Sequence, residues 1–160
     1  MTPPLLIIEI KKVRDAPPSL ACVRRDGSRT WARVHPFFPA HDLTHCAVES
    51  VFGLERAFFG LVASGWELDY FAQPGLAGRQ PPEALWAEHV VGLLERDAAL
   101  GAAALNQALA ASLPAGTAAL PIPTDDDVRR VRALRSDLVG RWAALPAGET
   151  LRVEFPATSR

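Results

Sequence analysis

The fold of this chain is decided first by residues 20–34, which read LACVRRDGSRTWARV. Asp26 and Gly27 separate two segments of alternating character. An Asp-Gly pair in this position is a strong hairpin signal, because glycine accepts the positive φ of a tight turn. After the turn, Trp31 lies between two arginines on one face, and smaller or apolar residues occupy the other. The stretch therefore predicts an antiparallel hairpin with one packed face and one polar face.

Two apolar stretches near the ends of the chain have the pattern of strands. Residues 5–10 read LLIIEI and are followed by Pro17-Pro18, which excludes a regular element there. Residues 150–155 read TLRVEF and alternate apolar with polar side chains. We expect this last strand to join the sheet formed by the N-terminal strands.

Helical patterns dominate the region between these strands. One runs over residues 42–64 and has apolar side chains on about half of its circumference. A second spans 81–113 with a break expected near Gly101, and a third spans 124–144. We therefore expect residues 1–160 to form a single α+β domain. In this domain a small, mostly antiparallel sheet packs against about three helices.

The composition excludes several classes of protein. A chain of 160 residues that is 49% hydrophobic and 22% charged can fold around its own core. The net charge of −1 predicts no nucleic-acid partner, and the sequence lacks the roughly 18 consecutive apolar residues of a membrane span. Two cysteines without CxxC spacing favour a reducing compartment, so we expect a cytoplasmic protein.

One segment carries residue types that bind metals. His41-Asp42-Leu43-Thr44-His45 places two imidazoles four residues apart, which is the spacing of the HExxH zinc motif on a helix. The segment departs from that motif where Asp42 replaces the glutamate that acts as general base. Because aspartate is one methylene shorter, it would not reach a metal-bound water without a backbone shift. The pattern indicates a divalent-metal site, for example for zinc, and leaves hydrolysis open.

A metal site built on His41 and His45 needs a third donor. Glu49 continues the series by one more turn. The helical rise of about 1.5 Å per residue, however, puts it about 12 Å from His41 along the axis, too far to share one ion. The candidate metal ligands are His41, His45, His89 and Glu49, with His35 and Glu88 as further possible donors.

A structural interpretation explains the same residues without a metal. Asp42 is a favoured N-cap residue, so the helix would begin there and leave His41 outside it. The two histidines would then not share a helical face. His45 would lie on a solvated or partly buried stripe, and Glu49 would be free to pair with Arg56. This interpretation needs fewer assumptions, and from the sequence alone we prefer it.

A short resemblance covers the same region. Residues 39–49 read PAHDLTHCAVE and are followed by FFGLVA at 58–63. This run resembles a segment of small uncharacterised bacterial proteins with the pattern P-x-H-D-L-x-H-x-x-V-E. The resemblance implies a bacterial source and no particular activity.

The sequence leaves two functions open. The first, which we expect, is a non-enzymatic module without a cofactor that binds a partner or self-associates as a homo-oligomer, since a small sheet leaves an exposed edge. The second is a metal-binding protein or metal-dependent hydrolase that uses His41 and His45. The sequence contains no phosphate-binding loop, nucleophile elbow or dinucleotide fingerprint to indicate another chemistry.

Overall fold

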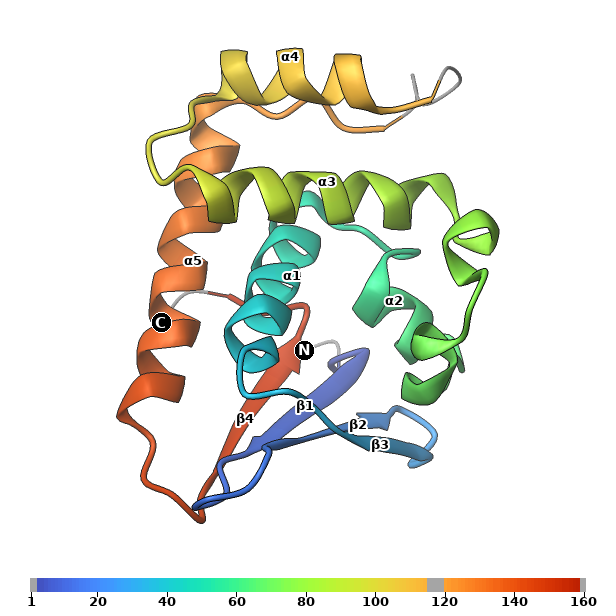
Figure 1. The fold of residues 1–160 in the computed structure, drawn as a ribbon, viewed down its shortest axis with the longest axis vertical. Helices are drawn as coiled ribbons and strands as arrows, with labels where there is room; N and C mark the ends of the chain where they lie inside the picture. Colours follow the sequence, from blue (N-terminus) through green and yellow to red (C-terminus); the bar gives the residue numbers. More distant parts are fainter. Residues whose placement is uncertain (1–2, 115–119, 159–160) are drawn as a thin grey trace.

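The computed structural model describes residues 3–114 and 120–158. Its strands are β1 (Leu6–Lys11), β2 (Ser19–Arg24), β3 (Arg29–Arg33) and β4 (Thr150–Phe155). They form one antiparallel sheet in the order β3-β2-β1-β4 (Figure 1). The predicted hairpin and the pairing of the C-terminal strand with the N-terminal sheet are both confirmed. The α+β class is confirmed as well.

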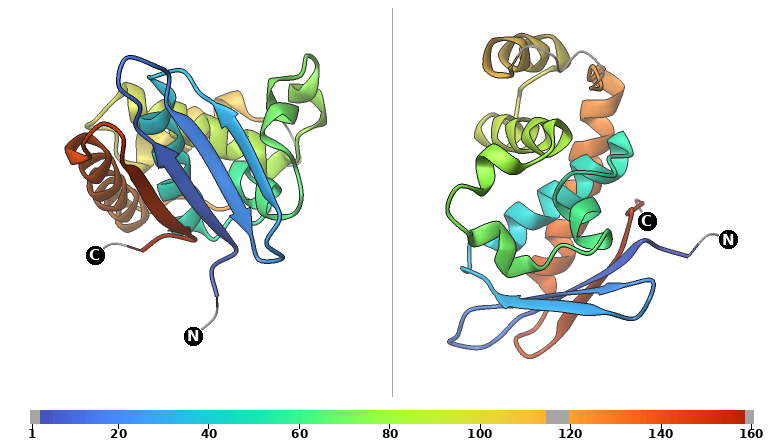
Figure 2. Two further views of the ribbon diagram at one scale, coloured as in Figure 1. Left: turned by 90° about the horizontal axis from the view of Figure 1, so that it is seen from below. Right: turned by 90° about the vertical axis from the view of Figure 1, so that its right-hand side faces the viewer.

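Alternation along the strands gives the sheet one buried face. Ile8 lies opposite Cys22 on one neighbouring strand and Val153 on the other, and all three side chains are buried. The helices of the described residues lie on this side of the sheet (Figure 2). The opposite face carries Trp31, which is 52% exposed. The sheet is therefore covered on one side, as the predicted packed and polar faces of the hairpin require.

The described chain also contains five α-helices and two short 3₁₀ helices. They are α1 (Phe38–Phe52), α2 (Phe58–Ala63), η1 (Leu68–Ala72), η2 (Leu76–Arg79), α3 (Pro82–Arg96), α4 (Ala102–Ser112) and α5 (Asp125–Ala144). The break expected near Gly101 separates α3 from α4. The third predicted helix corresponds to α5, which begins with a capping box formed by Thr124 and Asp127.

The first predicted helix differs from the observed structure at its start and in its middle. It begins at Phe38 rather than residue 42, because Pro39 is accepted within the first turn, where a backbone N–H has no helical partner. It ends at Gly53, whose φ of 64° is left-handed and whose N–H bonds back to the Glu49 and Ser50 carbonyls. The chain then starts again as α2.

Helix α1 is the centre of the packing. It contacts α5, α3 and α2, and its inner residues contribute to the same core as the sheet (Figure 1). Arg135 of α5 donates a hydrogen bond from Nε to Thr44 Oγ1 (2.8 Å), which fixes α1 against α5.

Cys22 and Cys46 are buried free thiols, and burial raises the pKa of each to about 12. None of the helices in the described part of the chain is both long and apolar enough to span a bilayer.

Candidate metal centre

Helix α1 presents His41 and His45 on one face. Both residues lie within the helix, one turn apart, and the centroids of their rings are 4.9 Å from each other. The expectation that Asp42 caps the helix is wrong, because the N-cap is Phe37 and Asp42 is a buried residue of α1. The expectation that His45 lies on a solvated or partly buried stripe is also wrong, since its side chain is buried and only 3% exposed. The two imidazoles are therefore available to a single site.

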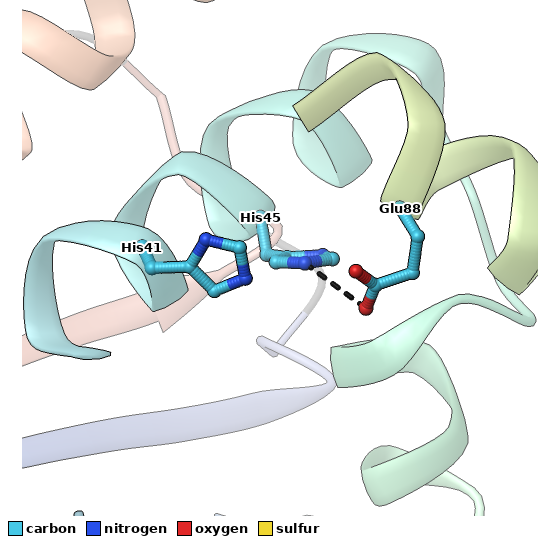
Figure 3. Close-up of side chains that lie close together, drawn as sticks. All are labelled: His41, His45 and Glu88. Carbon is cyan, nitrogen blue, oxygen red and sulfur yellow. Dashed lines mark ion pairs between the residues drawn. The ribbon is translucent and has the colours of Figure 1, made fainter. Parts of the chain in front are cut away.

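Glu88 of α3 brings a third donor to these histidines. One ligand atom from each of His41, His45 and Glu88 lies within 4.8 Å of the other two (Figure 3). Within this group, His45 Nε2 and Glu88 Oε1 are 3.2 Å apart. His89 follows Glu88 on α3 and does not belong to this group, because successive helical residues point about 100° apart. The structure thus selects Glu88 from the third donors that the sequence offered.

Two more carboxylates approach the other ring nitrogens of the histidines. Glu95 Oε2 lies 3.1 Å from His41 Nδ1, and Glu49 Oε2 lies 3.3 Å from His45 Nδ1. Histidines that bind metals commonly offer their second nitrogen to a carboxylate, which fixes the ring orientation. Sequence analysis missed Glu95. Its spacing of seven residues from Glu88, about two turns, could have placed both on one face of α3.

Glu49 is fully buried and connects α1 to α2. Its Oε1 accepts hydrogen bonds from the Phe59 N–H (2.9 Å) and the Gly60 N–H (3.4 Å). Its Oε2 faces His45, but within the described residues neither this oxygen nor His45 Nδ1 has a well-aligned hydrogen bond. These contacts replace the pairing with Arg56 considered from the sequence. Glu49 therefore lies behind His45, outside the group of three donors.

The charges around His45 favour a cation. Burial opposes protonation of its ring, but Glu49 and Glu88 outweigh this effect and raise the pKa of His45 to about 10. Partial burial would raise the pKa of Glu88, yet His45 lowers it overall. Burial raises the pKa of Glu49 and raises that of Asp42 to about 7. The carboxylates around His45 thus favour a positive charge at this position.

A cleft of about 560 Å³ opens beside the three donors, and His41, Asp42, His45 and Glu88 line part of it. This volume is within the range of about 300–1,000 Å³ typical of small-molecule pockets. His35 also lines the cleft, and its Nδ1 accepts a hydrogen bond from the Phe37 N–H (3.1 Å). An ion held by the donors would face a space large enough for water or a small molecule.

Comparison with known proteins adds no further constraint on this site. No protein-family model matches the chain, and no curated protein or solved structure shows significant similarity to it. The resemblance of residues 39–49 to a bacterial segment therefore stays a prediction. The geometry of the cluster carries the functional argument.

Proposed function

We propose that this protein binds a divalent transition-metal ion, Zn²⁺ in the first instance, through His41, His45 and Glu88. The observation that carries the proposal is the convergence of one donor atom from each of these residues within 4.8 Å. Two histidines and one glutamate are a donor set of catalytic zinc sites, which leave a fourth position for water or substrate. The same set also suits Fe²⁺.

The distances support a tetrahedral ion. Zinc–ligand bonds of about 2.0–2.1 Å imply ligand atoms about 3.3 Å apart at the tetrahedral angle. His45 Nε2 and Glu88 Oε1 are already 3.2 Å apart. Since Glu95 contacts Nδ1 of His41, the nitrogen left for the ion is Nε2. In a tetrahedral site this atom would lie at the same distance of about 3.3 Å from the other two.

The surrounding carboxylates support the same interpretation. Each histidine has an acid next to its Nδ1, Glu95 for His41 and Glu49 for His45. Such partners hold a proton on Nδ1 so that Nε2 can bind the ion, and they raise the basicity of the ring as a ligand. Glu88, the donor from α3, is half-exposed, so an ion can reach the site from solvent. A hydrolase would use this same ion to activate water, with Asp42 as the nearby carboxylate of the cleft.

The proposal is tested by metal analysis of protein purified without a histidine tag. After loading with Zn²⁺ and dialysis, we expect one ion per chain, and Co²⁺ in its place should give the visible absorption of a four-coordinate site. The His45→Ala variant should lose the ion and keep its circular dichroism spectrum. If the wild-type protein retains no stoichiometric metal, the proposal is rejected. The group would then be an ion pair between His45 and its two carboxylates.

Self-association is a second candidate function, supported by the exposed surface. Strand β3 is an edge of the sheet, and Trp31 on it is half-exposed. Exposed edges favour pairing with another chain. Light scattering across a hundredfold range of protein concentration should then show a dimer that forms as concentration rises. A monodisperse monomer throughout would contradict this second proposal and leave the first untouched.

A further inference from the structure

The cleft beside the three donors has mostly apolar walls away from them. Leu20 and Ala32 are paired across β2 and β3, and both line it from the sheet side. Phe58 at the start of α2 and Phe71 in η1 line it from the helical side, and their rings pack edge to face with centroids 4.6 Å apart. Such walls favour a hydrophobic body over a second charged group.

The charges near the proposed ion leave no positive excess. Glu88 as a ligand and Glu95 behind His41 together balance the charge of a dication. Arg33 also lines the cleft, but its guanidinium carbon lies 5.8 Å from the centre of the Trp31 ring on the outer face of the sheet. An anionic head group at the ion would therefore meet repulsion from the carboxylates around it.

We propose that the cleft binds a small amphipathic molecule, in which an uncharged donor atom completes the coordination of the metal ion and an apolar body lies between β3, α2 and η1. This inference rests on the proposed metal site and names the class of ligand that the site takes. The volume of about 560 Å³ accommodates a body of several carbon atoms beyond the donor. Its polar group binds the ion, and its apolar part covers the apolar walls of the cleft and excludes water from them.

The test uses Co²⁺-loaded full-length protein and a series of 1-alkylimidazoles from methyl to butyl, followed through the visible cobalt bands. Each methylene buried in the cleft should tighten binding by about fourfold, so that the butyl compound binds tens of times more tightly than the methyl compound. Valerate, an anion of similar length, should bind at least tenfold more weakly than 1-butylimidazole. Equal affinity across the alkyl series, or tighter binding of valerate, would overturn the inference.

A pair of variants locates the effect in the cleft. Ala32→Phe fills the space beside β3 and should abolish the gain with chain length while cobalt remains bound. Ala104→Phe adds the same ring on an exposed position of α4 and should change neither property. Persistence of the full chain-length gain in Ala32→Phe would contradict the proposed position of the apolar body. The wild-type series decides the inference even if this variant does not fold.

The two proposals fail in different ways. If the wild-type protein takes up no cobalt, the metal site itself is refuted. If cobalt binds but its spectrum does not respond to any imidazole, or responds equally to all, the metal site stands and the amphipathic ligand is refuted.

Discussion

Neighbouring residues of α3 give the sharpest test of the metal centre. Replacing Glu88 by Gln should remove metal-dependent stabilisation, and replacing His89 by Gln should not. Of these two neighbours, Glu88 is the one that belongs to the group of three donors, with Oε1 3.2 Å from His45 Nε2. Glu88→Gln is nearly isosteric, and His89→Gln replaces a side chain that is only partly buried. The metal-free fold should therefore persist in both variants. The ion pair of Glu88 with His45 contributes little on its own, because the glutamate side chain is 47% exposed.

The size of the effect follows from linkage between binding and unfolding. At a free Zn²⁺ concentration one hundred times the wild-type Kd, the ion stabilises the folded state by about 2.7 kcal/mol. For a domain of this size that raises Tm by about 5–11 °C. Loss of a hydrogen-bonding partner outside the coordination sphere weakens metal binding by about 10–100-fold. Loss of one of the three donors themselves should therefore weaken it by at least about 100-fold. At the same Zn²⁺ concentration the variant then gains about 0.4 kcal/mol and about 1–2 °C.

The assay is thermal unfolding by circular dichroism, with and without buffered Zn²⁺, on wild-type, Glu88→Gln and His89→Gln proteins. We expect the full Tm increase in the wild type and in His89→Gln, and almost none in Glu88→Gln. A full increase in Glu88→Gln would refute the assignment of the third donor. Loss of the increase in His89→Gln alone would assign that role to the histidine and show that α3 is rotated relative to the structure described above.

Three further predictions test the surroundings of the site and the fold. Glu95→Gln should weaken Zn²⁺ binding by about 10–100-fold through the orientation of His41 Nδ1, measured by competition with a chromophoric chelator; unchanged affinity would exclude this role. Gly60→Ala should lower Tm by several degrees, because the added Cβ collides with the Glu55 carbonyl group, whereas Gly140→Ala meets nothing and should leave Tm unchanged or raise it. Both cysteines should resist a thiol reagent at pH 8 in the folded protein and react in denaturant, because burial keeps them protonated well above their ordinary pKa; fast reaction of a folded thiol would contradict their placement in the core.

Burial of the thiols also sets a direction for alkaline stability. An unfolded thiol ionises near pH 8.5, whereas the folded thiols have a pKa of about 12. Their preference for the protonated form therefore favours the folded state fully below about pH 8.5 and is lost progressively as the pH rises above it. Denaturant unfolding between pH 8 and pH 11 measures this decline. Replacement of Cys22 by Ala should reduce the slope.

The strands were predictable because their signals are local. Asp26-Gly27 determines a tight turn, and alternation in the flanking segments determines which side chains face the core. The same is true of α5, whose capping residues Thr124 and Asp127 are three positions apart. The start of α1 was predicted too late because Asp42 is a favoured N-cap residue, although Pro39 fits within the first turn without leaving a hydrogen bond unmade.

Within the candidate site, the sequence indicated His41 and His45 as a possible pair but did not place both on one helical face. A spacing of four residues brings them to one face only if the helix begins before His41, whereas the sequence favoured a start at Asp42. It could not choose between Glu88 and His89, because these neighbours differ by about 100° and the choice depends on how α3 is rotated against α1. That rotation results from packing of side chains far apart in the chain.

The contacts of Glu49 could not be predicted from local sequence either. Its spacing from His45 made it a candidate ligand or a partner of Arg56, and both expectations treat it as part of an isolated helix. In the structure, Gly53 ends α1 and the chain returns as α2, so that the Phe59 and Gly60 N–H groups reach the Glu49 carboxylate. Local sequence determined which elements form and which faces they present. Only tertiary structure decided which polar groups meet, because burial and charge at each one depend on neighbours from other elements.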